Sequence, residues 1–193
     1  MATSFNIVDG IEKIYYAVLN EKNEQYGEVK LFSDMVVEFG MSPTQNSTSV
    51  YGSNREITSI LGNLTGEVTL TVQSLDEEVQ AEVMGKVKAQ GGGYLDKGLS
   101  KPYVALMVEK SLDGGEFEYL TLYKGKFDLA EEKAKTKEDQ AEAQAQSYTA
   151  RFIQLKDKTF KYAVRTTNME EQEKTAFLEK WGKQVIKPAV AQE

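Results

Sequence analysis

Apolar and polar residues alternate strictly along much of this chain. In residues 66–74 the apolar side chains Val68, Leu70 and Val72 alternate with charged or polar ones, and residues 11–19 repeat the pattern. A period of two is typical of a β-strand with one buried face, because successive side chains point to opposite sides. The same reasoning predicts further strands over residues 27–39 with a break near Ser33, and over residues 55–61, 103–110, 117–127, 146–155 and 159–166.

Two short connections predict β-hairpins. Asp113, Gly114 and Gly115 join the strands at 103–110 and 117–127, and glycine accepts the positive φ that tight turns require. Residues 156–158 join the last two predicted strands in the same way. Both faces of residues 103–108 are apolar, which predicts a strand that is covered on both sides.

Two segments have helical spacing instead. Ser74 and Glu77 have the spacing of a capping box, and valines recur every four residues from Val79 to Val87, before the glycines at 91–93 end the element. Residues 168–181 predict a C-terminal helix that ends at Gly182. The predicted fold is therefore mainly β, with one flanking helix and a C-terminal helix in a single domain over residues 1–182, followed by a flexible tail at 183–193.

Residues 130–146 combine helical composition with strand periodicity. The segment is rich in Ala, Glu, Lys and Gln, which favour a helix. From Gln140 onward, however, Ala141, Ala143 and Ala145 alternate with polar residues, and this period continues into Tyr148. Because alanine and glutamine are poor strand formers, we expect such a strand to be stabilised by packing, including packing against another subunit.

Residues 40–54 show neither the period of two that is typical of a strand nor the spacing that is typical of a helix. They are rich in Gly, Ser, Thr and Asn and contain Pro43, so we expect a long loop. Loops of about 15 residues are uncommon in compact domains and are usually functional or disordered.

Composition excludes several classes of function. The 193 residues include no cysteine and no histidine, which removes disulfides, thiolate nucleophiles and the commonest general base and metal ligand. The formal net charge of −7 disfavours tight binding to nucleic acid, which requires basic residues. There is no apolar run long enough to span a membrane and no signal peptide, so we expect no membrane association.

Motifs that carry catalysis or bind cofactors are missing as well. The chain has no P-loop, no dinucleotide-binding fingerprint and no nucleophile elbow. The glycines at 91–93 follow a helix rather than precede one, and the acidic clusters at 76–78 and 170–171 lie at predicted helix starts, where they complement the helix dipole. We therefore expect no catalytic residues, no cofactor and no metal.

Three stretches of the chain resemble parts of one known family. Residues 10–32, GIEKIYYAVLNEKNEQYGEVKLF, are similar to the start of that family, with its G-x-x-x-x-Y-Y-A strand before a polar turn. Residues 47–57, STSVYGSNREI, occupy the place of a loop that commonly reads Y-A-D-D, which Gly52, Ser53 and Asn54 replace here. Residues 101–139 resemble a run with P-Y, Y-K-x-K-F and T-K elements. By these three stretches the chain resembles the major tail proteins (tail-tube proteins) of long-tailed bacteriophages.

The resemblance implies a β-sandwich of roughly orthogonal sheets, of the tail-tube type, in a virion protein made in the host bacterial cytoplasm. Such subunits form hexameric rings that stack into a hollow tube, through which DNA passes transiently without specific binding. The tube also contacts other tail proteins at its tip and terminator ends. In this setting the loop 40–54 and the arm 128–142 become candidate inter-subunit elements, with contact residues Thr44, Val50, Tyr51, Arg55, Ala141, Ala143 and Ala145.

Alternatives remain at this stage. The tube protein of a contractile tail or of a secretion-type injection machine shares the fold. A small ligand-binding β-barrel module would instead contain one large apolar cavity. An enzyme is disfavoured because no constellation of carboxylate, Lys, Tyr or Ser side chains stands out.

Overall fold

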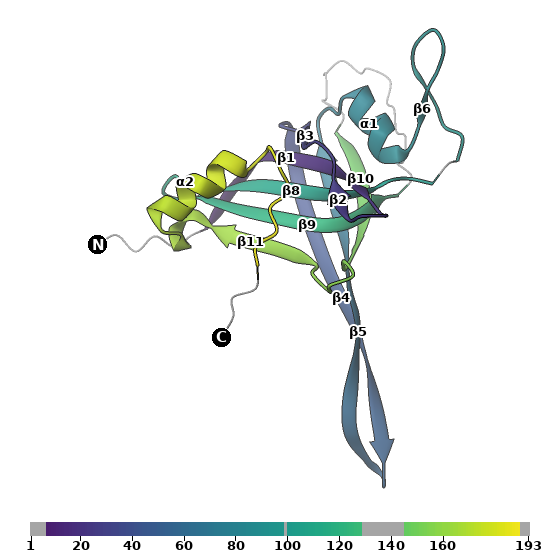
Figure 1. Ribbon diagram of the computed structural model, residues 1–193, viewed down its shortest axis with the longest axis vertical. Coiled ribbons are helices and arrows are strands. Elements are labelled where there is room, and N and C mark those ends of the chain that lie inside the picture. Colours follow the sequence, from purple (N-terminus) through teal and green to yellow (C-terminus); the bar gives the residue numbers. More distant parts are fainter. Residues whose placement is uncertain (1–6, 99, 129–144, 190–193) are drawn as a thin grey trace, which may run out of the picture.

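Nine strands form one hydrogen-bonded sheet in the computed structural model, which describes residues 7–98, 100–128 and 145–189 (Figure 1). The order along the sheet is β2-β1-β8-β9-β10-β5-β4, with β3 also paired to β1 and β11 also paired to β9. The mainly β prediction with one flanking and one C-terminal helix is confirmed. The strands are β1 (Val8–Asn20), β2 (Gln25–Tyr26), β3 (Lys30–Ser33), β4 (Val36–Gly52), β5 (Arg55–Val72), β8 (Tyr103–Leu112), β9 (Phe117–Phe127), β10 (Gln146–Ile153) and β11 (Lys161–Arg165).

The sheet changes direction along β9. Figure 1 shows β4 and β5 running across β8 and β9, so one continuous sheet supplies the two crossed directions expected of an orthogonal sandwich. An extra residue in β9 shifts its register against β8 between the pairs Val104↔Gly125 and Leu106↔Leu122. Such a bulge increases the local bend of a strand.

The prediction that residues 146–166 form a hairpin is wrong. β10 pairs with β9 at residues 125–127 and with β5, whereas β11 pairs with β9 at residues 118–122. Both strands therefore use the same edge of β9, one on each side of the bend. Sequence proximity suggested that they pair with each other, but the longer β9 offers each of them a better partner.

The principal core lies between the two directions of the sheet. Its largest side chains come from β1, β3, β5, β9 and β10, and the ring of Phe32 stacks on Phe127 at 5.4 Å between centroids. The strict alternation predicted for β5 is confirmed, because Val68, Leu70 and Val72 are fully buried. Residues 104–108 of β8 are all buried, as expected for a strand covered on both sides.

Helix α1 (Glu77–Met84) flanks this core and is shorter than predicted. Asp76, rather than Ser74, caps it by accepting hydrogen bonds from the backbone N–H groups of Glu78 and Val79. Gly85 ends the helix in a left-handed conformation, so Val87 lies in β6 (Val87–Lys88), which pairs with β7 (Tyr94–Leu95). The spacing of the valines continued past the helix, but the earlier glycine determined its end.

A second apolar layer covers the outer face of β1, β8, β9 and β11. It consists of helix α2 (Glu171–Lys180), which follows a short 3₁₀ turn, η1 (Thr166–Asn168), and of the segment after it. Phe177 and Trp181 pack on Tyr119, with the Tyr119 and Trp181 rings 4.6 Å apart between centroids. This layer explains why β8 is buried on both faces.

The predicted flexible tail is attached to the body over the part that the structure describes. Val185 and Ile186 pack against this second layer, and the hydroxyl of Tyr123 donates a hydrogen bond to the carbonyl of Ile186 at 2.9 Å. Lys187 forms an ion pair with Asp157. The sequence after Gly182 gave no sign of these contacts, because they are made by one adjacent pair of apolar side chains, by one backbone carbonyl and by the side chain of Lys187.

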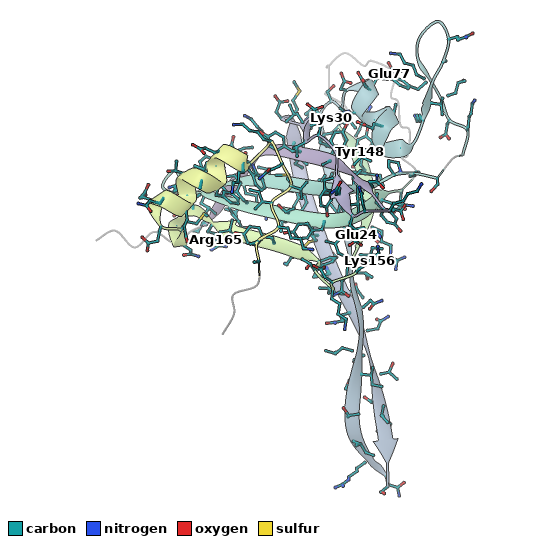
Figure 2. All side chains as sticks on the ribbon, in the orientation of Figure 1. Glu24, Lys30, Glu77, Tyr148, Lys156 and Arg165 are labelled. Carbon is teal, nitrogen blue, oxygen red and sulfur yellow. The ribbon has the colours of Figure 1, made fainter. Side chains whose placement is uncertain are left out.

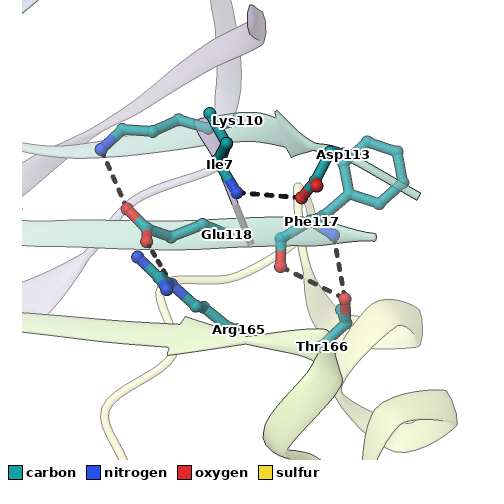
Figure 3. Close-up of polar contacts among 7 residues, drawn as sticks. All are labelled: Ile7, Lys110, Asp113, Phe117, Glu118, Arg165 and Thr166. Atoms are coloured by element: carbon teal, nitrogen blue, oxygen red, sulfur yellow. Dashed lines mark hydrogen bonds and ion pairs between the residues drawn. The ribbon is translucent and has the colours of Figure 1, made fainter. Parts of the chain in front are cut away.

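Polar contacts fix the end of the sheet nearest α2 (Figure 3). Glu118 accepts hydrogen bonds from Lys110 at 3.0 Å and from Arg165 at 2.7 Å, which joins β8, β9 and β11. Burial alone would raise the pKa of Glu118, but these two cations lower it below its ordinary value. Nearby, the backbone N–H of Ile7 donates to Asp113 at 2.9 Å.

Candidate assembly surface

Residues 40–54 are not a loop. They belong to β4, which pairs with β5 from Val36↔Val72 as far as Gly52↔Arg55, and the two strands form a long hairpin that projects from the body (Figure 1). Most of the Ser and Thr residues that suggested a loop are cross-strand partners of β5, namely Ser42, Thr44, Ser47, Thr48 and Ser49. The hydrophobic alternation is missing because neither face of this part of the hairpin is buried, so no selection for an apolar face is visible in the sequence.

The body stops covering the hairpin near Gly66. The ring of Phe160 lies so close to Gly66 that a Cβ there would be 2.8 Å from the ring. One step further, the backbone N–H of Leu64 donates to the side chain of Gln154 at 3.0 Å. Beyond this point residues 42–63 are almost entirely exposed, and Figure 2 shows their side chains pointing away from both sides of the ribbon. We call residues 42–65 the projecting hairpin.

Local backbone chemistry defines the tip. Ser53 and Asn54 form the two-residue connection, and both have positive φ, at 52° and 61°. Two left-handed residues in succession are the mark of a type I′ turn, whose twist matches that of the flanking strands. Asn tolerates this conformation well, so the sequence at the tip favours a tight turn rather than a flexible connection.

The projecting hairpin is nearly uncharged but partly apolar. Arg55 and Glu56 are its two charged residues, although 27% of the whole chain is charged. Its exposed apolar side chains include Tyr51, which is 70% exposed, and the set Val50, Ile57, Ile60 and Leu61. A two-stranded ribbon is marginally stable by itself in water, and exposed apolar clusters commonly mark interaction sites. These properties indicate a surface that is completed by a partner.

The outer edge of β4 has no strand partner among the described residues. A free edge of 17 residues would readily pair with other chains. Pro43 interrupts it by removing one N–H donor, and the pairing with β5 shifts register at three places along β4. These features restrict indiscriminate edge pairing, so a neighbour must match an irregular edge.

The structure brings four of the predicted contact residues onto one element. Val50, Tyr51 and Arg55 lie at the tip, and Thr44 lies near the base, where its carbonyl accepts a hydrogen bond from the Thr65 hydroxyl at 3.3 Å. Ala145 is exposed and lies directly before β10, whose first residue Gln146 pairs with Val72 at the other end of β5. The two predicted contact regions are therefore far apart along β5.

Most of the predicted arm, including Ala141 and Ala143, lies outside the described residues. Of residues 128–142 the structure describes only Asp128, whose backbone N–H donates a hydrogen bond to the carbonyl of Thr149 at 2.8 Å. The alternation predicted for the strand itself is confirmed where it is described, because Tyr148, Ala150 and Phe152 are buried.

Sequence reasoning missed the apolar residues of the second strand. Ile57, Ile60 and Leu61 lie in the strand predicted over residues 55–61, but they were not named as contact residues, and each is more than half exposed. A signal was present, because residues 39–54 and residues 57–66 contain no charged residue and are separated only by Arg55 and Glu56. Such symmetry about a turn predicts two arms of one hairpin.

Other kinds of site find little support. Among the residues that the structure describes, no group of three or more acidic side chains could hold a metal ion. No helix in the same residues is long and apolar enough to cross a membrane. The described strands form an open sheet, ending in β2 and β4, rather than a closed ligand-binding barrel.

The structure defines the protein as an open, mainly β domain with a long projecting hairpin that carries two charged residues. The sequence comparison is more specific: residues 43–186 match the family described as phage tail tube protein. Because the match spans most of the chain, the protein belongs to the phage tail tube protein family. A comparison with curated proteins gives no match.

Proposed function

We propose that this protein is the major tail subunit, and that it polymerises as stacked hexameric rings into a hollow conduit for DNA ejection. Membership of the tail tube family establishes a structural protein of a phage tail. The projecting hairpin supports polymerisation, because it exposes apolar side chains and a free strand edge that the subunit cannot cover by itself. This hairpin is the observation that carries the proposal.

Assembly covers the exposed apolar side chains of the projecting hairpin and also provides a partner for its free strand edge. Pairing of the free β4 edge with a neighbouring copy provides hydrogen-bond partners for backbone groups, as in other cases of β-strand addition. A cyclic arrangement then closes the ring and leaves no edge unpaired. Residues 128–142 are a second inter-subunit element in this proposal, and proteins at the tail tip and terminator end bind the two ends of the tube.

The charge of the chain suits transport of DNA. With a formal net charge of −7, a bore that shares the overall composition repels phosphate groups, so DNA slides rather than binds. Purified tubes should therefore retain no measurable double-stranded DNA at 0.15 M salt in a co-sedimentation assay. Saturable binding would contradict this part of the proposal.

The register of the hairpin provides a variant that lacks it and that we expect to fold. Gln45 and Leu64 are cross-strand partners, so residues 46–63 can be replaced by an Asn-Gly turn. We expect this variant to unfold at nearly the same temperature as the unmodified protein but to form no tubes by negative-stain electron microscopy. As a matched control, Tyr51→Asp should block tubes, whereas Lys180→Asp on exposed α2 should not. Tubes of normal length from the shortened variant would refute the role of the hairpin.

A further inference from the structure

A short two-stranded ribbon lies apart from the main sheet. Among the described residues, β6 and β7 pair only with each other, and three consecutive glycines at residues 91–93 form the turn between them. All three glycines have positive φ, and a Cβ added to any of them would meet no atom within 4 Å. The turn therefore projects into open space, and Figure 1 shows the ribbon extending from the body beside α1.

The base of this ribbon is held by the body. Gly85 ends α1, and a Cβ added to it would lie 3.2 Å from the Cα of Lys101, so the two residues that flank the ribbon lie close together. The side chain of Lys101 donates a hydrogen bond to the carbonyl of Phe127 at 2.9 Å, which fixes this end to β9. Residues 86–98, which we call the basic ribbon, are thus a projection with a fixed base.

The basic ribbon combines positive charge with exposed apolar side chains. It contains three lysines and one carboxylate, whereas the whole chain has a formal net charge of −7. Val87 and Leu95, which are cross-strand partners, are 37% and 50% exposed. Because an isolated two-stranded ribbon is at best marginally stable in water, we expect this surface to be completed by a partner that is both acidic and apolar.

A surface with this composition lies around the start of β4. Its apolar side chains Leu31, Met35 and Val37 are exposed by 43%, 56% and 51%. The one cation of residues 28–38, Lys30, is already paired with Glu82 at 2.9 Å. We call residues 28–38 the acidic segment. Its carboxylates, all exposed, are Glu28, Asp34 and Glu38.

The basic ribbon and the acidic segment lie on different sides of α1. Figure 1 shows β3, which belongs to the acidic segment, on one side of this helix and β6 on the other. Both lie toward the end of the molecule that is opposite the tip of the projecting hairpin. The ribbon extends away from β3, so its exposed residues face a neighbour rather than the acidic segment of their own chain.

We propose that the basic ribbon binds the acidic segment of a second copy of this chain, its neighbour in the same ring. Val87 and Leu95 contact the apolar side chains of the segment, and the lysines lie beside its carboxylates. Apolar contact with opposite charges at the rim is the usual composition of a specific interface. The two surfaces are different, and such heterologous contacts close into a ring when the rotation between copies allows it. The inference rests on the proposed tube function and concerns contacts within a ring, so it does not depend on the projecting hairpin.

Cysteine cross-linking tests the contact directly, because the chain contains no cysteine of its own. Two single variants, Leu95→Cys and Met35→Cys, are mixed in equal amounts, assembled and oxidised. Disulfide-linked dimers that contain both variants, identified by mass spectrometry, should reach at least tenfold the yield from a control mixture of Leu95→Cys with Lys180→Cys, which places the second thiol on α2. Tubes that form without the Leu95–Met35 cross-link, or with equal cross-linking in the control, would overturn the inference and leave the tube function intact.

The double variant Leu95→Cys, Met35→Cys distinguishes a ring contact from other contacts. After assembly and oxidation it should give a ladder of covalent oligomers that ends at the hexamer, because the last contact closes the ring. A disulfide within one chain, or a ladder that continues past the hexamer, would overturn the inference.

A charge exchange provides a test that needs no oxidation. The variant Lys88→Glu, Lys97→Glu should raise the protein concentration needed for tube formation at least tenfold, because it places carboxylates opposite carboxylates. Adding Asp34→Lys and Glu38→Lys to the same chain should restore assembly. Circular dichroism and thermal unfolding verify that each variant folds.

The matched control for the charge exchange is Lys180→Glu, Lys183→Glu, at the end of α2 and directly after it, which should assemble as the unmodified protein does. Normal assembly of the ribbon variant, or an exchanged variant no better than the ribbon variant, would overturn the inference. Failure of the unmodified protein to form tubes under any condition would instead overturn the proposed function, and this inference with it.

Discussion

The two halves of the β4–β5 pair differ in burial: one half is covered by the core, and the other is exposed on both faces. Near the body, Val68, Leu70 and Val72 of β5 are fully buried, and Phe39 and Met41 of β4 pack against the same core. In the projecting hairpin the same two strands continue their pairing with no covering layer. The comparison teaches that hydrophobic alternation reports burial of one face, whereas pairing and turn chemistry can extend a strand without it.

The body and the projecting hairpin also differ in how much burial of apolar side chains stabilises them. Each buried Val or Leu side chain stabilises the fold by about 1.5–3 kcal/mol. The projecting hairpin gains little of this term in the free subunit, and its net hydrogen-bond contribution is modest. We therefore expect the hairpin to depend on assembly for its order, and the body to fold without assembly.

The largest contrast is expected from truncation of apolar side chains. Phe127→Ala should reduce the free energy of unfolding by about 3–5 kcal/mol, because the ring is 1% exposed and stacks on Phe32. Ile60→Ala should change it by less than about 0.5 kcal/mol, since this side chain is exposed. Urea unfolding of the two variants measures both. Equal losses would mean that the hairpin is packed in the free subunit.

Glycine replacements separate crowded from open positions. At Gly125 a Cβ would lie 2.6 Å from ring atoms of Phe152, so Gly125→Ala should cost about 1–3 kcal/mol. At Gly40 the nearest atom would be 3.9 Å away, and Gly40→Ala should be close to neutral. Thermal unfolding tests the pair, and a destabilised Gly40→Ala with an unaffected Gly125→Ala would contradict the packing described for the body.

Much of the body could be predicted from the sequence, because its strands bury one face. The segment around Tyr148 and the strand around Leu70 are examples in which alternation located both the strand and its buried side. The end of α1 could not be predicted, because a single glycine, Gly85, determines it. The partners of β10 could not be predicted either, because they depend on the length of β9. The projecting hairpin was missed because an uncovered ribbon has no hydrophobic signature, although Tyr51 and Arg55 were still chosen as contact residues.

Lowering the pH should reduce the stability that the ion pairs of Glu118 contribute at the end of the sheet near α2. The pKa of Glu118 is lowered in the folded protein, so its contribution is fully present above its unfolded pKa, near 4.3, and is lost as the pH falls through the lower folded pKa. Glu118→Gln should therefore destabilise the protein by about 1 kcal/mol at pH 7, and this difference should vanish at low pH. A difference that is independent of pH would contradict the ion pairs with Lys110 and Arg165.

The smallest effect is expected at Glu109, which lies on the same sheet but has the opposite shift. Burial raises the pKa of Glu109, although its side chain accepts a hydrogen bond from the Trp181 indole at 3.3 Å. Its ionisation disfavours the fold, so this contribution declines as the pH rises from the unfolded pKa through the higher folded pKa. Glu109→Gln keeps an acceptor for Trp181 and should stabilise the protein by a few tenths of a kcal/mol at pH 7. Thermal unfolding at pH 4 and pH 7 measures the effect, and a marked loss of stability would contradict this assignment.

Hydrogen exchange tests the central contrast most directly. In the free subunit, amides of β8 and β9 should exchange slowly, whereas those of residues 46–61 should exchange rapidly. In assembled tubes, residues 46–61 should become protected, while exposed α2 residues should change little. Rapid exchange of residues 46–61 in intact tubes would contradict the account, because the projecting hairpin would then remain uncovered after assembly.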